Sequence, residues 1–339
     1  MRYLRNLSTD VYYNMAFDEY ALEQLPLDEP LFYLWQNRAA VIIGLNQNIH
    51  TEVDLDYARQ HGISVARRIT GGGAVYHDLG NLNYTIVGRS ADIERDYPEY
   101  TRHMQRALQA LGLKAELSGR NDILVEGRKV SGYAKRVYKD RLMVHGTLMY
   151  DVDLERLTRV LTPPTEKFAS KGIASVKSRV ANLRDYLPGF ADIAAFGQAL
   201  EQHLSCQYRD EEYRLTEVQL SEIRAIARDK FATTDWLYGR SPSNVIAYTK
   251  RLPCGNITVH MDIKRGCIAQ CAITGDFLGN RPIATIESLL QGCLYERTAL
   301  QQRLASITMQ DYLDGTDADT FINLLFNNNI DVIHDAETT

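Results

Sequence analysis

The sequence predicts an α+β protein built from two domains. A length of 339 residues is long for a single hydrophobic core and suits two. Segments with helical periodicity alternate along the chain with short runs rich in β-branched and aromatic residues. Gly, Pro and two serines gather in "YGRSPSN" (Tyr238 to Asn244), a composition typical of a linker. We therefore expect one domain over residues 1–240 and a smaller α+β domain over residues 241–339.

The first ninety residues change from a helical pattern to strands. "NMAFDEYALEQL" has apolar residues at helical spacing and stops before Pro26. "LFYLWQN" and "AVIIGLNQ" predict two strands of one sheet, with Asn37 and Arg38 at the turn between them. "ISVARRIT" continues the sheet, and its alternation places Arg67 and Arg68 on opposite faces of the strand. "NLNYTIVG" predicts another strand.

The rest of the chain supplies a helix, a hairpin and the second domain. "EYTRHMQRALQALG" carries an apolar stripe and ends at Gly112. "NDILVEGRKVSGYAKRV" predicts a β-hairpin that turns at Glu126 and Gly127, and "RLMVHGTLMYDV" predicts a further strand. The helix "DLERLTRVL" ends at two prolines, and "KFASKGIASVKSRVANL" predicts a loop that faces a ligand. Helices in "IAAFGQALEQHL" and "EVQLSEIRAIARDKF" complete the first domain. In the second, "NITVHMDIKRGCIAQCAIT" predicts two strands, which the helices "TIESLLQGCL" and "DTFINLLF" follow.

Composition excludes several classes of protein. The net charge of −5 argues against a chain whose main role is to coat a polyanion such as DNA. Residues 1–25 do not form a secretory signal, and no window reaches the 18 or so apolar residues that would span a bilayer. An odd number of cysteines without metal-ligand spacing makes a disulfide framework or a zinc site a poor interpretation. We expect a cytoplasmic protein. The cysteines are Cys206, Cys254, Cys267, Cys271 and Cys293.

The stretch "RRITGGGAVYHD" (residues 67–78) contains three consecutive glycines, which suit a close approach of a ligand to the main chain. Exposed N–H groups there could form a nest for an anion. The stretch lacks the endings of a P-loop and of a dinucleotide-binding turn. Arg68 is expected to contact an anion because guanidinium suits carboxylate and phosphate. The alternatives are a glycine hairpin between two strands and, for Arg67, an exposed salt bridge.

Four motifs resemble the lipoate-protein ligases in order and spacing. They are "RRITGGGAVYHD", "GRNDILVEGRKVSGYA", "HGTLMYDVDL" and "SKGIASVKSRVANL", and "QGCLYERTALQQ" resembles the small accessory domain of the two-domain members. The four motifs together are highly specific, although the first is shared in weaker form with octanoyl transferases and distantly with biotin ligases. The resemblance implies a mixed-sheet, biotin/lipoate ligase-like catalytic domain with a small C-terminal α+β accessory domain.

The resemblance also implies a two-step reaction. Lipoate and MgATP give lipoyl-adenylate and pyrophosphate, and the ε-amine of an acceptor lysine then displaces AMP. The implied partners are apo lipoyl domains, of 2-oxoacid dehydrogenase E2 subunits, of the glycine-cleavage H protein, or of both. No nucleic acid and no membrane are expected as partners, and the chain is expected to be a monomer.

Site residues are carried over from the family motif by motif. Lys129 would contact the lipoyl carbonyl oxygen and the α-phosphate, although a lysine in a hairpin is in isolation usually a solvated charge. The residues that would contact ATP are Arg68 and, through their backbone, Gly73, Ala74, Val75 and Tyr76.

The remaining assignments keep an alternative beside each role. His77 would line the lipoate cavity or be a hydrogen-bonded structural histidine. Asp122 would help to hold Mg²⁺, whereas the neighbouring Asn121 could simply make a turn. Trp35 and His145 would form walls for the acyl tail, or, for Trp35, pack in the core. The loop around Lys171 resembles the adenylate-binding loop, the alternative being a flexible surface connection.

Two other functions are compatible with parts of the sequence. An octanoyl or lipoyl transferase without ATP activation is the nearest, but such enzymes commonly use a cysteine nucleophile, and every cysteine here lies outside the four motifs. A nucleic-acid-binding module is suggested by "RKVSGYAKRVYKDR" (residues 128–141), which interleaves basic residues with tyrosines. We instead expect this basic strip to face solvent or to dock an acidic lipoyl domain.

Overall fold

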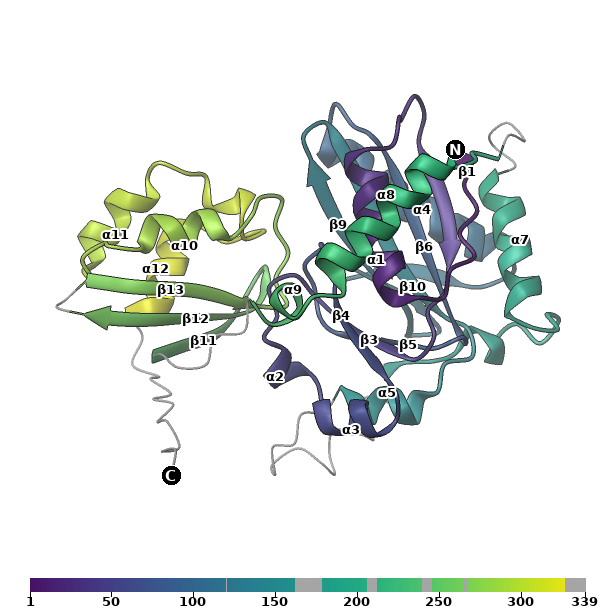
Figure 1. Cartoon of the computed structure of the whole chain (residues 1–339), viewed down its shortest axis with the longest axis horizontal. Helices are drawn as coiled ribbons and strands as arrows, with labels where there is room; N and C mark the ends of the chain where they lie inside the picture. The colour runs from purple at the N-terminus through teal and green to yellow at the C-terminus, as the bar shows by residue number, and fades with distance from the viewer. Residues whose placement is uncertain (120, 162–178, 206–211, 240–245, 265–266, 327–339) are drawn as a thin grey trace. The chain divides into compact units, whose positions relative to one another are not determined.

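The computed structural model describes residues 1–119, 121–161, 179–205, 212–239, 246–264 and 267–326 (Figure 1). The chain forms two compact units. The first comprises Met1–Ile42, Glu52–Thr70 and Val75–Thr233, and the second comprises Ile43–Thr51, Gly71–Ala74 and Thr234–Thr339. The predicted domain boundary at residue 240 lies outside the described residues and stays a prediction. No helix in the described part of the chain is both long and apolar enough to cross a membrane.

A seven-stranded mixed sheet organises the first unit, in the order β1-β2-β6-β10-β9-β8-β7. β1 runs parallel to β2, and the other neighbours are antiparallel. The expectation of an α+β fold with a mixed sheet is therefore confirmed. The strands are β1 (Arg2–Tyr3), β2 (Leu31–Trp35), β6 (Asn81–Arg89), β7 (Ala115–Ser118), β8 (Asp122–Val125), β9 (Arg128–Tyr138) and β10 (Arg141–Met149).

Helices pack against this sheet and complete its core. α1 (Val11–Glu23) begins at Asp10, whose side chain accepts a hydrogen bond from the backbone N–H of Tyr13, and it contacts β6 and β10. α4 (Ile93–Ala110) buries Met104 and Leu108 and contacts α7. The other helical segments of the first unit are α3 (Leu55–Gln60), α5 (Leu154–Val160), η1 (Leu183–Asp185), α7 (Ile193–Ser205), α8 (Glu217–Ile226) and the π-helical η2 (Ala227–Phe231), whereas α2 (Ile49–Glu52) falls mainly in the second unit.

A second, three-stranded sheet has the order β4-β3-β5. Its strands are β3 (Ala40–Ile43), β4 (Ser64–Arg67) and β5 (Val75–His77). The single sheet expected for "LFYLWQN" and "AVIIGLNQ" is wrong, because β2 pairs with β1 and β6, whereas β3 pairs with β5. The glycine hairpin is wrong as well, since β3 lies between the two strands that the glycines connect.

The hairpin between β8 and β9 forms where the sequence predicted it. Val125 pairs with Arg128, so that Glu126 and Gly127 alone make the turn. Their φ angles are 51° and 77°. Two central residues with positive φ form the type of tight turn whose twist matches that of the strands.

The second unit contains a three-stranded antiparallel sheet, β11-β12-β13, with helices beside it (Figure 1). β12 (Gly255–Lys264) and β13 (Cys267–Gly275) are the two predicted strands, and α10 (Ala284–Leu290) and α12 (Ala318–Phe326) are the predicted helices. The sequence interpretation missed β11 (Ile246–Leu252), α9 (Thr234–Tyr238), α11 (Arg297–Leu304) and η3 (Met309–Asp311).

Candidate functional site

Lys129 and Asp122 form an ion pair on the β8–β9 hairpin. The lysine Nζ lies 2.7 Å from the Asp122 Oδ1, with the two side chains 37% and 34% exposed. The register of the hairpin shifts between Ile123 and Leu124, so that Ser131 and Lys129 face consecutive residues of β8. This bulge lets the lysine fold back over Gly132, where an added Cβ would lie 3.1 Å from Nζ. Absence of a side chain at Gly132 therefore makes room for the ion pair.

The backbone of Lys129 is held by another segment of the first unit. Its carbonyl oxygen accepts a hydrogen bond from the N–H of Ala181 at 3.0 Å, and it forms a bridge with Val180. Ala181 belongs to the fourth motif, "SKGIASVKSRVANL". The end of this motif therefore fixes the strand position of Lys129, whereas Lys171 lies outside the described residues.

Arg68 is buried, with only 7% of its surface exposed. Its Nε donates to the Thr70 hydroxyl at 2.9 Å, and its Nη1 donates to the carbonyl oxygen of Ile42 at 3.1 Å. Burial, and then the charge of Arg67, lower the pKa of Arg68 to about 10, so the guanidinium remains charged at neutral pH. The alternative of an exposed salt bridge at Arg67 is wrong, because that side chain is fully buried.

His77 is a buried, neutral histidine in β5. Burial, followed by the nearby charge of Arg68 and then by the neighbouring His145, lowers its pKa to about 3. Asn14 donates to the Oδ1 of Asn37 at 2.8 Å, which directs the Asn37 amide nitrogen toward the His77 Nδ1 at 3.1 Å. The Nδ1 is thus an acceptor, and the ring proton lies on Nε2. That Nε2 is buried and has no hydrogen-bond partner among the residues that the structure describes.

His145 and Trp35 belong to a buried polar network that also contains Asp18. The His145 Nδ1 lies 2.6 Å from an Asp18 carboxylate oxygen, and the indole N–H of Trp35 donates to Thr85 at 3.0 Å. Sequence reasoning missed Asp18 and Thr85. The available signal for Asp18 was a carboxylate on the apolar face of a predicted helix, next to Phe17.

The glycine stretch falls partly in the second unit. Gly73 and Ala74 belong to that unit, whereas Val75 and Tyr76 belong to β5 in the first. Within the second unit, the N–H of Gly72 lies 3.4 Å from the carbonyl oxygen of Phe277, and a Cβ at Gly71 would lie 2.5 Å from the same oxygen. A bare backbone is therefore required at Gly71 by main-chain packing.

The predicted metal site offers one carboxylate, that of Asp122. Asp122 presents a partly exposed side chain, and its Oδ1 already contacts Lys129. No group of three or more His, Cys, Asp or Glu side chains suited to a metal was found among the described residues. Magnesium commonly uses one or two protein carboxylates and takes its other ligands from water and phosphate. As a single, partly exposed carboxylate, Asp122 fits a magnesium ion that arrives with a nucleotide.

Lys135, in the middle of the basic strip, is buried, and its Nζ lies 4.5 Å from the ring centre of Tyr97, so the solvent-facing interpretation is wrong at this position.

The four described cysteines are free and all lie in the second unit. Burial raises the pKa of Cys271 to about 12, which is unsuited to a thiolate nucleophile.

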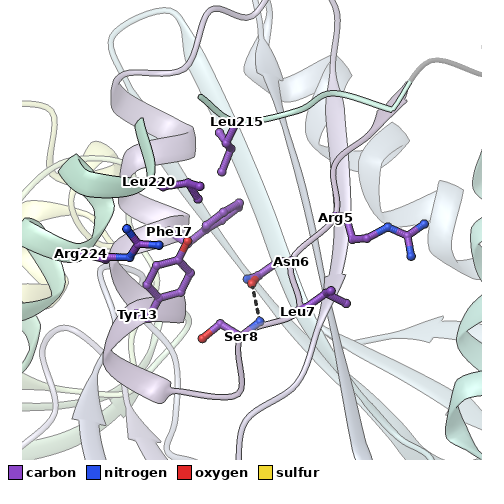
Figure 2. A pocket seen from close by; sticks show the side chains of 9 residues that line it. All are labelled: Arg5, Asn6, Leu7, Ser8, Tyr13, Phe17, Leu215, Leu220 and Arg224. Atoms are coloured by element: carbon purple, nitrogen blue, oxygen red, sulfur yellow. Dashed lines mark hydrogen bonds between the residues drawn. The ribbon is translucent and has the colours of Figure 1, made fainter. Parts of the chain in front are cut away.

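A separate concavity of about 460 Å³ lies between α1 and α8 in the first unit. Figure 2 shows Leu220 and Arg224 beside Tyr13 and Phe17, while the side chain of Arg5 points away from them. None of the residues predicted for the site lines this concavity. The predicted site and this surface groove are thus distinct features.

Comparisons with known proteins agree with the four motifs. The family model "Lipoyl protein ligase A/B catalytic domain" matches residues 10–205, and "Bacterial lipoate protein ligase C-terminus" matches residues 241–325. The chain is 38% identical over 317 residues to lipoate-protein ligase LplJ of Bacillus subtilis (strain 168), covering 92% of this chain and 96% of the relative.

Two solved structures are also similar. A bi-partite lipoate protein ligase of Thermoplasma acidophilum, described with its E2 lipoyl domain, is 32% identical with a TM-score of 0.66, covering 72% of this chain and 98% of its own. A lipoate-protein ligase A bound with ATP is 30% identical with a TM-score of 0.62, covering 70% and 98%. The matches extend over both parts of the chain, which therefore belongs to the lipoate-protein ligase family and is an enzyme of that family.

Proposed function

We propose that this enzyme activates lipoate with ATP and transfers the lipoyl group to a lysine of an apo lipoyl domain. The observation that carries the proposal is the position of Lys129. It is a partly exposed cation held over Gly132 by Asp122, in the unit that also holds the buried guanidinium of Arg68. An ATP-bound relative and a relative described with its lipoyl domain support the two substrates.

In the first step, a lipoate carboxylate oxygen attacks the α-phosphorus of ATP and pyrophosphate leaves. Negative charge gathers on the α-phosphate oxygens, where the ammonium group of Lys129 would stabilise it. Arg68 would contact a phosphate, and the backbone N–H groups of Gly73, Ala74, Val75 and Tyr76 would face the nucleotide. Magnesium, held by Asp122, would neutralise phosphate charge.

In the second step, the ε-amine of the acceptor lysine attacks the acyl carbonyl carbon. The amine loses a proton, an amide forms, and AMP leaves with the electron pair of the broken acyl–oxygen bond. Lys129 would stabilise the oxyanion of the tetrahedral intermediate. The Nε2–H of His77, which is buried and has no partner in the described part of the chain, would donate to an oxygen of the bound acyl group.

The acceptors in this proposal are apo lipoyl domains of 2-oxoacid dehydrogenase E2 subunits or the glycine-cleavage H protein, which the enzyme would meet as a monomer. The test is mass spectrometry of an apo lipoyl domain after incubation with enzyme, lipoate and MgATP, with ATP omitted in a parallel reaction. Lipoyl addition only when ATP is present supports the proposal. Addition from an acyl carrier protein without ATP would instead identify a transferase.

A further inference from the structure

A chain of hydrogen bonds leads from Asp18 to Arg68 through the interior of the first unit. The Asp18 Oδ2 lies 2.6 Å from the His145 Nδ1, and the His145 Nε2 lies 2.7 Å from the Thr70 hydroxyl. The same hydroxyl accepts from the Arg68 Nε at 2.9 Å. All four side chains are buried, with at most 7% of each residue exposed. The chain joins α1, β10 and the segment that follows β4, which are far apart in the sequence.

Donor and acceptor inventories fix both ends of this chain. Arginine can only donate, so Thr70 accepts from the Arg68 Nε. The Asp18 carboxylate can only accept, so the His145 Nδ1 donates to it. The Thr70 hydroxyl and the His145 Nε2, 2.7 Å apart, connect the two ends. Connected hydrogen bonds polarise one another, and this connection links Arg68 to Asp18 without a direct contact.

The carboxylate end of the chain is fixed on its other side. The Asp18 Oδ1 accepts from the Tyr33 hydroxyl at 2.6 Å and from the Thr85 hydroxyl at 2.9 Å. Burial, and then the Asp18 charge, raise the pKa of Tyr33 well above its ordinary value, so the phenol keeps the proton that it donates. Thr85 in turn accepts from the Trp35 indole at 3.0 Å. The rest of the fold thus determines where the carboxylate lies.

A buried polar chain of this kind contributes little net stability, because each group loses its hydration. Its advantage is a fixed orientation of the groups at its end. The Arg68 Nε is held by Thr70 and its Nη1 by the Ile42 carbonyl. These two contacts hold the guanidinium at two of its nitrogen atoms and set the orientation of its plane.

We propose that Asp18, His145 and Thr70 are positioning residues that orient Arg68 for the phosphate of the nucleotide. The inference rests on the proposed function, in which Arg68 contacts ATP. It assigns to α1 and β10 a role in nucleotide affinity that requires no contact between Asp18 or His145 and the nucleotide.

The test measures the dissociation constant of MgATP by calorimetry for a set of variants in the full-length enzyme. Thr70→Val removes the bridging hydroxyl with little change of shape, and Thr70→Ser retains it. Thr101→Val is the matched control, since Thr101 is also buried and its hydroxyl donates to the Pro98 carbonyl at 2.9 Å, within its own helix. We expect Thr70→Val to weaken MgATP binding at least about tenfold, and Thr70→Ser and Thr101→Val to bind nearly as the wild type does.

Asp18→Asn gives a second route if Thr70→Val does not fold, and both are repeated in an Arg68→Gln background. If the chain acts through Arg68, these substitutions weaken binding in the wild-type background and change little once Arg68 is gone. Equal losses in both backgrounds, or no loss in either, would overturn the positioning role. Unchanged MgATP affinity in Arg68→Gln alone would instead contradict the role of Arg68 in the proposed function.

Discussion

Substitution of Gly132 by alanine should displace the proposed catalytic lysine and lower activity while leaving the fold intact. A Cβ at this position would lie 3.1 Å from the Lys129 Nζ, 3.2 Å from its Cε and 3.8 Å from the Asp122 Oδ1. The first two distances are shorter than ordinary van der Waals contact, so the ammonium group must move. It can do so cheaply, because it is the end of a flexible side chain and is 37% exposed.

The expected size of the effect differs between activity and stability. Relief of these contacts requires the ammonium group to move by a few tenths of an ångström. Because a displacement of about 1 Å at a reacting group can reduce a rate by about 100-fold, we expect a smaller loss of roughly 3- to 10-fold. The free energy of unfolding should change by no more than about 1 kcal/mol, because Gly132 lies in strand β9 and its φ is not in the left-handed region.

The assay is lipoate-dependent exchange of pyrophosphate into ATP, with urea unfolding measured in parallel. Gly189→Ala is the matched control, because a Cβ there meets nothing within 4 Å. Normal exchange in Gly132→Ala would refute the reasoning that the bare strand position holds Lys129 in its working place.

Two further predictions concern Asp122 and His77. Asp122→Asn should change the free energy of unfolding by less than about 1 kcal/mol, because the ion pair with Lys129 is partly exposed. The same substitution should raise the magnesium concentration needed for half-maximal pyrophosphate exchange. An unchanged magnesium dependence would show that Asp122 is not part of the metal site. The pKa of His77 in the folded chain is about 3, whereas a histidine in the unfolded chain has a pKa of about 6.5. Between these two values the unfolded chain binds a proton on His77 and the folded chain does not. The stability that is present above pH 6.5 is therefore lost as the pH falls toward 3. Relative to His77→Asn, the wild type should lose about 1.4 kcal/mol per pH unit between those limits in urea unfolding, and parallel curves for the two proteins would contradict the buried neutral assignment.

Local patterns identified what is local in this structure. The Glu126–Gly127 turn, the helix that stops near Gly112 and the α+β class follow from turn residues and periodicity, because these depend on neighbours in the sequence. The pairing of strands does not follow from such local patterns. β2 and β3 belong to different sheets although their sequences look alike.

Long-range contacts explain the residues that the sequence could not place. Asp18 and His145 are 127 positions apart, and nothing in either segment indicates that they meet. Burial of Arg67 and Lys135 likewise depends on what other elements bring to those positions, whereas charge alone suggests a surface. Motif resemblance located Lys129 and Asp122, and the 2.7 Å contact between them adds what the motif did not state.

The central claim is that Lys129 stabilises the charge that develops when lipoate attacks ATP. Its most direct test is pyrophosphate exchange by Lys129→Ala, compared with Lys114→Ala, which removes an exposed lysine elsewhere in the first unit. The account predicts that Lys129→Ala loses about 3 to 4 kcal/mol of transition-state stabilisation, while Lys114→Ala exchanges at the wild-type rate. Exchange by Lys129→Ala at a rate close to that of the wild type would contradict it.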